Sequence, residues 1–566
     1  MRRHLATRLT FLLTTVAFLA GAPRLSAQNK LYTFNGDAAG DMLGFPVAGA
    51  GDVNKDGYLD FVVGAPQLFS PGPGSARVLS GADGAILYTF YGDSVGDTFG
   101  RSVAGAGDVN KDGYTDVIVG APEDDDNGAD SGSARVFSGV DGSILRTFYG
   151  PSAGDYFGYS VAGAGDVNKD GYADVIVGAF GDGGSTGSAW ILSPADGAIL
   201  YKFNGDSAGD RFGWSVDGAG DVDKDGYADL IVGAWLDDDN GPDSGSARVL
   251  SGADGSILHT FYGDSPQHLF GVSVAGAGDV NADGSDDVIV GAPTSAFLHS
   301  SDSGSARVLS GADGAILYTF YGDSVGDTFG GSVAGAGDVN KDGYADVIVG
   351  APNNGTGFAR VLSGADGTIL YTFYGDSVGD TFGQSVVGAG DVNKDGYADI
   401  IVGAYGDDDN GAESGSARVF SGLGCCPSTG LSCTSAPCES CPAMVATTTG
   451  GAPTLGNNSF ALELVNAPSN MTYAVLALSS NPCAEVGYSY VFCDTVKAPE
   501  PWWFLAAMPF TPGVSTCTTN VQVSAPIPNN AVFLGMALGV QWATSCDASV
   551  LGTSISNCVS FVVTDT

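Results

Sequence analysis

Positive charge and histidine are scarce in this sequence, and their scarcity excludes several classes of function. Among 566 residues, 22 are Lys or Arg and 64 are Asp or Glu, which gives a formal net charge of -42, and only four are His. Most of the basic residues stand near the N-terminus or at repeated positions, so no basic stripe is available to follow a phosphate backbone. We therefore expect no nucleic-acid partner. An acidic surface suits cation binding, a basic partner or solubility alone.

Cysteine is absent from the first 424 residues, since all ten cysteines lie between Cys425 and Cys558. In an exported chain an even, clustered set of cysteines indicates disulfides rather than a zinc site, even at Cys438-Glu-Ser-Cys441. Five cysteines fall in each half of the cluster, so complete internal pairing requires at least one bond between the halves. The change of composition predicts a Cys-rich linker over 424–442 and a small C-terminal β domain, a β-sandwich, over 443–566.

Long apolar runs are also missing beyond the N-terminus, where no stretch reaches the ~18 residues that a membrane span needs. The N-terminus itself begins with Arg2, Arg3 and Arg8, continues with the apolar stretch 9–20, and offers the small residue Ala27 before a cut at Gln28. This pattern predicts a signal peptide over 1–27. We expect a secreted or cell-surface protein with no transmembrane segment.

No segment carries a helical 3.6-residue stripe, whereas internal repetition dominates the chain. The run FGRSVAGAGDVNKDG at 99–113 recurs seven times with small changes, at intervals of 53 to 59 residues. Each unit contains four strand-like segments, which in the second unit are 102–106, 116–120, 133–137 and 144–148. Four strands in each of seven units predict an all-β, seven-bladed β-propeller over 28–423.

The two ends of the repeat array predict how the ring closes. A fourth-strand segment occurs at 31–34, before the first unit is complete, and none follows the last third strand at 416–421. The seventh blade therefore lacks an outer strand, and the first strand of the chain is spare. We expect 31–34 to complete blade seven, because a closed ring removes the exposed edge that an open array would leave.

Each unit also carries the loop Asp-x-Asn-x-Asp-Gly-Tyr-x-Asp, which is rich in the oxygen ligands that Ca²⁺ prefers. Side chains at positions 1, 3, 5 and 9 and the carbonyl of position 7 would supply six or more oxygens, and Gly at position 6 permits the turn. An EF-hand would need Glu at position 12, which is Val63 in the first unit, and flanking helices. Nonapeptide β-helix repeats have a different period, and a solvated turn does not explain seven matched copies.

The sequence thus predicts up to seven structural Ca²⁺ ions as the only cofactor, with no catalytic role because full protein ligation leaves no place for substrate. The expected ligand residues, unit by unit, are Asp52, Asn54, Asp56, Tyr58, Asp60; Asp108, Asn110, Asp112, Tyr114, Asp116; Asp166, Asn168, Asp170, Tyr172, Asp174; Asp221, Asp223, Asp225, Tyr227, Asp229; Asp279, Asn281, Asp283, Ser285, Asp287; Asp338, Asn340, Asp342, Tyr344, Asp346; and Asp391, Asn393, Asp395, Tyr397, Asp399.

The order Phe-Gly, Asp/Asn loop and Gly-Ala-Pro in each unit resembles the FG-GAP repeat of integrin α-subunits and of bacterial secreted proteins, over residues ~30–423. The resemblance implies a seven-bladed propeller with calcium between its first and second strands and ligand on the opposite face. The departures from the pattern are Leu43 for Phe, Asp223 for Asn, Ser285 for Tyr, and Phe180, Trp235 and Tyr405 for Pro. None of them removes a ligand oxygen.

Several other motifs resemble functional sites. The G-x-S-x-G string around Ser94, Ser324 and Ser377 lacks the strand-to-helix turn and histidine of a hydrolase elbow. His268 and His299 lack a third metal ligand, so exposed loop residues are the simpler interpretation. Three acidic insertions at 124–127, 237–240 and 407–410 are either solvated loops or a recognition surface on the face opposite calcium.

These observations favour a non-enzymatic binding or adhesion module whose partner is an extracellular protein or glycan. The alternatives are an extracellular, phospholipase-like hydrolase, because some FG-GAP propellers accompany such enzymes, and a purely structural surface component. A hydrolase would need a nucleophile, a base and an orienting group in one pocket, and the sequence offers no such set.

Overall fold

The computed structural model describes residues 30–68, 72–293, 302–353 and 355–422 with their side chains, and beyond them only the course of strands β29 to β36. Contacts divide the chain into Met1–Gly424 and Cys425–Thr566. The predicted signal peptide, the linker and the disulfides lie outside the described residues and stay predictions. None of the helices in the described ranges is long and apolar enough to cross a bilayer.

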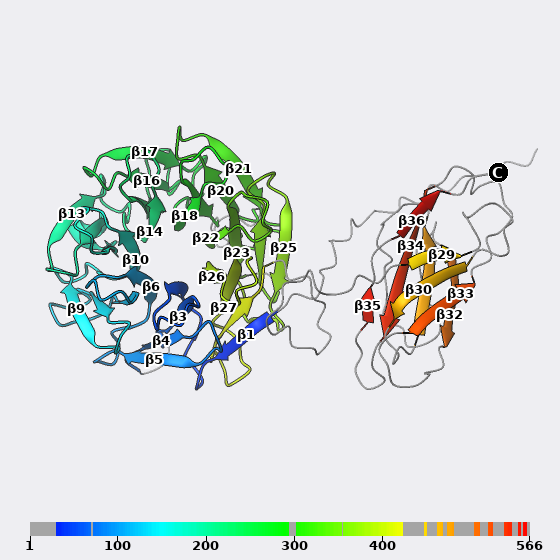
Figure 1. Ribbon diagram of the computed structural model, residues 1–566. Helices are drawn as coiled ribbons and strands as arrows, with labels where there is room; N and C mark the ends of the chain where they lie inside the picture. The colour runs from blue at the N-terminus through cyan, green and yellow to red at the C-terminus, as the bar shows by residue number, and fades with distance from the viewer. Residues whose placement is uncertain are drawn as a thin grey trace, which may run out of the picture. The chain divides into compact units, whose positions relative to one another are not determined.

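The first unit is a ring of seven four-stranded antiparallel sheets, so the predicted seven-bladed propeller is confirmed (Figure 1). The blades are, in order, β2 (Val47–Gly51), β3 (Asp60–Ala65), β4 (Ser75–Leu79), β5 (Ile86–Tyr91); β6 (Ser102–Gly107), β7 (Asp116–Ala121), β8 (Ser133–Phe137), β9 (Ile144–Tyr149); β10 (Ser160–Gly165), β11 (Asp174–Ala179), β12 (Ser188–Leu192), β13 (Ile199–Asn204); β14 (Ser215–Gly220), β15 (Asp229–Ala234), β16 (Ser246–Leu250), β17 (Ile257–Tyr262); β18 (Ser273–Gly278), β19 (Asp287–Ala292), β20 (Ser305–Leu309), β21 (Ile316–Tyr321); β22 (Ser332–Gly337), β23 (Asp346–Ala351), β24 (Phe358–Leu362), β25 (Ile369–Tyr374); and β26 (Ser385–Gly390), β27 (Asp399–Ala404), β28 (Ser416–Phe420) with β1 (Lys30–Asn35). One short helix, α1 (Asp182–Ser185), interrupts the third blade.

Closure of the ring follows the predicted strand exchange. Strand β1 pairs antiparallel with β28, with Thr33 opposite Arg418 and Phe34 opposite Ala417, so the N-terminal strand is the outer strand of blade seven. Figure 1 shows the blue β1 beside the yellow strands at the end of the propeller. The two ends of the array are thereby held together by a backbone ladder, and the edge of β28 is covered.

The core lies between the blades and is made by two features of the repeat. The second strand, DVIVGA in several blades, is buried at all six residues, as expected of a strand covered on both faces. The Phe of each Phe-Gly pair, such as Phe99 at 0% exposure, fills the space between neighbouring blades. Its Gly partner is required by close approach, because Gly100 has φ +88° and a Cβ there would lie 2.2 Å from the Ser75 carbonyl oxygen.

Within the second unit the structure describes eight strands in two sheets. They are β29 (Ala446–Thr449), β30 (Ala461–Ala467), β31 (Tyr473–Ser479), β32 (Trp503–Pro509), β33 (Thr519–Ser524), β34 (Ala537–Ser545), β35 (Thr553–Ile555) and β36 (Val559–Val562). One sheet has the order β29-β30-β33 and the other β32-β31-β34-β35, with β36 also paired to β34. A β-sandwich over 443–566 stays a prediction.

Candidate functional site

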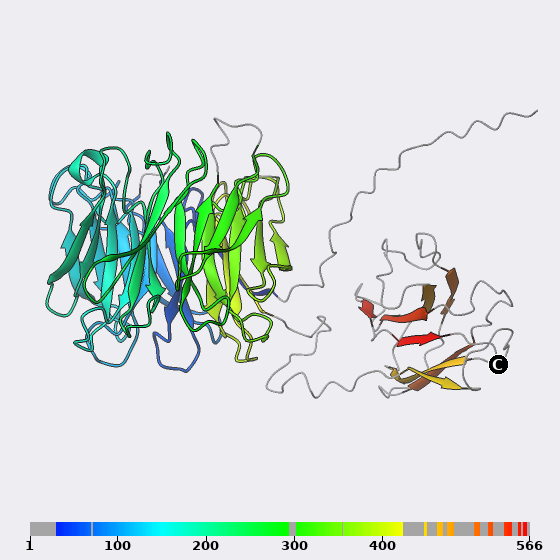
Figure 2. The same cartoon turned by 90° about the horizontal axis from the view of Figure 1, so that it is seen from above.

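The strand connections lie on two opposite faces of the ring, because successive strands of each blade run in opposite directions (Figure 2). All seven predicted calcium loops connect the first and second strands of their blades and so emerge on one face, the loop face. They are 52–60, 108–116, 166–174, 221–229, 279–287, 338–346 and 391–399. The connections from the second to the third strand, and from each blade to the next, lie on the opposite face.

Each of the seven loops is closed by hydrogen bonds between its own acidic side chains and its backbone. In the first loop Asp52 accepts from Gly57 N, Asn54 accepts from Asp56 N, and Asp56 accepts from Tyr58 N. The bond from the Gly amide to the opening Asp recurs in every loop at 2.7–3.0 Å. These bonds gather the side chains of positions 1, 3 and 5 on one tight turn.

The charge and hydrogen bonding of these loops fit a divalent cation. In four of them the Oδ1 atom of the opening aspartate is buried without a hydrogen-bond partner among the described residues: Asp52, Asp166, Asp221 and Asp391. In the fourth loop Asp221, Asp223 and Asp225 each offer a carboxylate oxygen within 4.8 Å of the others. An unpartnered buried carboxylate oxygen is costly, and a cation would satisfy it. The oxygens of positions 1, 3 and 5 and the carbonyl of position 7 would hold the ion, and ligation by the aspartate of position 9 stays a prediction.

The ninth-position aspartates have a role that sequence reasoning missed. Asp60 is fully buried, and its two oxygens accept from Val53 N at 2.8 Å and Gly81 N at 2.9 Å. It therefore ties the loop to the turn between the third and fourth strands. Burial raises its pKa to about 6, against the lowering effect of these amides. The same pair of backbone hydrogen bonds to one carboxylate occurs at Asp116, Asp229, Asp287, Asp346 and Asp399.

Lysines at loop position 4 connect neighbouring blades. Lys55 Nζ lies 4.0 Å from the centre of the Tyr114 ring in the next loop, and Lys394 Nζ lies 3.4 Å from that of Tyr58 across the closure. Unit five breaks the series, because Ser285 replaces the tyrosine, and Lys224 contacts only Asp283 there, donating to its carbonyl at 2.8 Å and lying 3.9 Å from its carboxylate. The seventh position therefore supplies a cation–π partner as well as a carbonyl.

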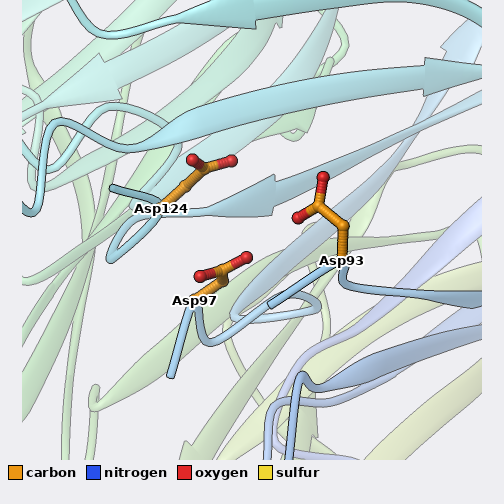
Figure 3. A group of neighbouring side chains, drawn as sticks. All are labelled: Asp93, Asp97 and Asp124. Carbon is orange, nitrogen blue, oxygen red and sulfur yellow. The ribbon is translucent and has the colours of Figure 1, made fainter. Parts of the chain in front are cut away.

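On the opposite face, acidic side chains gather around a buried arginine. Figure 3 shows Asp93 and Asp97, from the loop between β5 and β6, beside Asp124 from the loop after β7. Arg135 of β8 donates to Asp93 at 2.7 Å and to Asp124 at 3.3 Å. Burial raises the pKa of Asp97 to about 7, with a further contribution from its hydrogen bond to Asp93. Arg135 therefore offsets part of the negative charge of this acidic cluster and joins two of its members in an ion-pair network.

The same pairing recurs around the ring: Arg77–Asp37, Arg248–Asp206, Arg307–Asp264, Arg360–Asp323 and Arg418–Asp376. Unit three differs, because Trp190 stands at the arginine position and Pro151 at the aspartate position. There Lys202 of the neighbouring strand lies 4.4 Å from the centre of the Trp190 ring and pairs with Asp182 at 2.7 Å. In unit three the positive charge therefore stands on the fourth strand instead of the third. It pairs with Asp182, which occupies the position of Asp124 in unit two.

The ion-pair network limits what the three acidic insertions offer. Their first aspartates, Asp124, Asp237 and Asp407, are at most 2% exposed and accept from Ser133, Ser246 and Ser416 at 2.5–2.6 Å. The interpretation of the insertions as solvated loops is therefore wrong for these three aspartates. Each is buried and binds its loop to the first serine of the third strand. A recognition role for the exposed remainder stays a prediction.

The serine and histidine residues considered as sites from the sequence have structural contacts or lie outside the described residues. Ser94 donates its backbone N–H to Asp97 at 3.1 Å, and within the described ranges no hydrogen bond joins it to a histidine. His268 Nε2 lies 3.3 Å from Ser305 Oγ, its Nδ1 accepts from Asp264 N, and burial lowers its pKa. His299 lies outside the described residues. His268 thus serves the hydrogen bonding of its own loop.

Comparisons with known proteins agree with this architecture. A family model described as FG-GAP repeat matches residues 46–79, 99–137, 157–192, 270–309, 329–367 and 382–420, and a second model of the same description matches 204–250. The chain is 34% identical over 226 residues to integrin alpha-V of Gallus gallus, covering 37% of this chain and 22% of that protein. It is 32% identical over 210 residues to integrin alpha-5 of Xenopus laevis, covering 34% and 20%. The chain thus aligns with about a fifth of the length of these relatives.

Proposed function

Because residues 46–420 form an FG-GAP repeat propeller of the integrin α type, we propose that this protein is a secreted or cell-surface, cation-stabilised binding module. Its partner is an extracellular protein or glycan, held on the face opposite the loop face. The protein is an adhesion component and performs no catalysis.

The observation that carries the cation part of the proposal is the buried, unpartnered carboxylate oxygen of the opening aspartate in four of the seven loops. Ca²⁺ suits them, because it accepts six to eight oxygens in flexible geometry, whereas Mg²⁺ demands a near-ideal octahedron. Each ion would join the first and second strands of one blade. Up to seven ions act structurally, and the binding itself occurs elsewhere.

The opposite face suits recognition because its loops stand on a rigid support. In blades two and seven the buried arginines Arg135 and Arg418 hold the loop entering the blade against the loop that follows its second strand, and in four other blades an arginine pairs with the entering loop. Loops fixed in this way lose little conformational entropy when they bind a partner. The exposed carboxylates of the acidic insertions and the aromatic side chains near the axis are the available contact groups.

The test is a screen of the full chain against glycan and extracellular-protein arrays, in calcium and in chelator. We expect at least one partner that is retained in calcium and released as the propeller loses its ions. A folded, calcium-loaded protein that binds nothing on either array would contradict the proposal and favour a purely structural component. Hydrolysis of an array ligand would contradict the absence of catalysis.

A further inference from the structure

A cavity of about 370 Å³ opens on the face opposite the loop face, where units two, three and four meet. Its walls come from the loops that enter these blades and from the loops after their second strands. Arg101, Arg211 and Trp214 belong to the first kind, and Glu123 and Phe180 belong to the second. The volume lies within the roughly 300–1,000 Å³ of small-ligand sites.

Aromatic rings form one continuous wall of this cavity. Tyr156 stacks on Phe180 with ring centroids 4.9 Å apart and planes inclined by 8°. Trp214 lies 5.1 Å from Phe180 and 4.4 Å from Tyr159. These side chains are half-buried, so part of each ring faces solvent. Such a wall offers wide apolar faces on which a flat ligand surface can stack.

Two arginines line the same cavity without a carboxylate partner. Arg101 donates to Tyr159 Oη at 2.6 Å, and its Cζ lies 4.5 Å from the centre of the Phe45 ring. Arg211 packs its guanidinium 5.3 Å from the centre of the Trp235 ring. Across the described ranges neither forms an ion pair, although all six repeated third-strand arginines do. Two guanidiniums against the single Glu123 carboxylate leave an excess of positive charge along the cavity lining, and this favours an anion in a chain of net charge -42.

Comparison of the units indicates that the fold does not require these side chains. Most of the residues that line the cavity stand at three positions of the repeat: the residue before Phe-Gly, the residue after it, and the residue after the second strand. Units three and four carry Tyr156, Tyr159, Phe180 and Arg211, Trp214, Trp235, whereas units five and six carry Leu269, Val272, Pro293 and Thr328, Gly331, Pro352. Units five and six have small or aliphatic residues at these positions and form the same blade. The aromatic and arginine side chains of units three and four are therefore not needed to form a blade, which is consistent with a role in binding.

We infer that this cavity binds a glycan whose sugar ring carries a carboxylate or a sulfate group. The guanidiniums of Arg211 and Arg101 present paired N–H donors that match such a planar or tripodal anion. The apolar face of the sugar ring stacks on Trp214 and Phe180, and the exposed Glu123 carboxylate accepts from ring hydroxyls. An acidic peptide suits the site less well, because its flexible side chains offer no rigid apolar ring face to the aromatic wall. The inference rests on the proposed function and gives its ligand class and location.

The experiment titrates the full, calcium-loaded chain with four probes: trigalacturonate, a sulfated trisaccharide, neutral galactotriose and tetraglutamate. Binding is followed by calorimetry and by tryptophan fluorescence, because Trp214 lines the cavity. At least one acidic sugar binds, and the neutral sugar and the peptide bind about tenfold more weakly or not at all. Whether the uronate or the sulfate binds more tightly identifies the anionic group.

Matched variants locate the binding. Arg211→Gln weakens the acidic sugar by about tenfold or more, as expected from loss of a charge-assisted hydrogen bond. Arg146→Gln removes the same charge from another arginine without an ion pair, which donates to the Pro194 and Ala195 carbonyls outside the cavity, and leaves affinity unchanged. Trp214→Leu also weakens binding and removes the fluorescence response. Thermal midpoints equal to that of the parent protein verify that the variants are folded.

Several outcomes would overturn the inference. They are equal affinity for galactotriose, tighter binding of tetraglutamate, unchanged affinity in both Arg211→Gln and Trp214→Leu, or no binding of any acidic sugar. These failures are distinguishable from failure of the proposed function. An array partner whose binding survives Arg211→Gln leaves the adhesion module standing and removes only this site, whereas a folded chain that binds no array ligand contradicts the module itself.

Discussion

The two faces of the ring are built by the same repeat, yet they vary differently from unit to unit. On the loop face positions 1, 5 and 9 are Asp in all seven loops, and the departures at positions 3, 4 and 7 are Asp223 in unit four and Ala282 and Ser285 in unit five. On the opposite face the residue after Phe-Gly ranges from Gly331 to Trp214. Uniformity is what seven equivalent structural contacts require, and local variation is what a single binding site requires.

The comparison also separates two ways of holding neighbouring segments together. The loop face uses side chains that reach from one loop to the next, as Lys55 does to Tyr114. The opposite face uses buried charges such as Arg135, which join two loops of one blade. Breaking a buried pair costs more than removing an exposed contact, so the two faces should respond differently to substitution.

The largest effect should come from cutting the chain at the closure that both faces share. Removal of residues before Gly40 deletes β1, exposes the edge of β28 and opens the ring, so we expect aggregation or pairing with a second chain. Limited proteolysis and size-exclusion chromatography measure this. The control removes everything after Gly424, which contains no propeller strand, and should leave the propeller folded. A harmless N-terminal cut would mean that the ladder between β1 and β28 does not hold the ring.

The next largest effect should come from chelation, which acts on the loop face alone. An ion that binds only the folded state stabilises it by about 2.7 kcal/mol per site at a hundred-fold excess over Kd. Several occupied loops therefore raise the thermal midpoint substantially, although coupling between blades prevents simple addition. Melts in chelator, in calcium and in magnesium test this, with calcium expected to stabilise most. An unchanged midpoint in chelator would remove the structural role of the cation.

On the opposite face, Arg135→Trp should destabilise the propeller by about 3 kcal/mol, since Asp124 is left buried without its cation. Adding Thr147→Lys places a lysine opposite position 135, as Lys202 stands opposite Trp190 in unit three. The double variant should recover a large part of the loss. Denaturant unfolding of the parent, single and double variants measures both steps. Equal stability of the two variants would show that the lysine of unit three does not substitute for the arginine.

The smallest effect should come from the lysines of the loop face. Lys55→Met removes one cation–π contact and should cost about 0.5–1 kcal/mol. Lys224→Met is the control, because the neighbouring loop has Ser285 in place of tyrosine: it removes an exposed 3.9 Å ion pair with Asp283 but no ring contact, and it should cost less. Thermal melts at saturating calcium compare the two. Equal losses would show that the ring contact of Lys55 contributes no more than the exposed ion pair of Lys224, beyond the carbonyl contacts that both lysines share.

The sequence alone determined the architecture, because its information is local and repeated. Seven copies of one unit specify seven blades, and the spare segment at 31–34 together with the missing strand after 421 specifies the closure. The loop spacing places positions 1, 3 and 5 on one turn, where hydrogen bonds hold them. Each of these features depends on residues within a few positions of one another or on counting.

Only the tertiary structure decided how the side chains are shared between segments far apart in the chain. The partner of Arg135 is 42 residues away, and the ninth-position Asp60 reaches Gly81 across a turn. Arg101, Phe180 and Trp214 belong to three units and meet only because the ring brings their loops together. In the sequence, equivalent residues of the repeat have nearly the same flanking residues in every copy, so their contacts with other units cannot be told apart. Packing in a closed ring decides which departures from the repeat face one another.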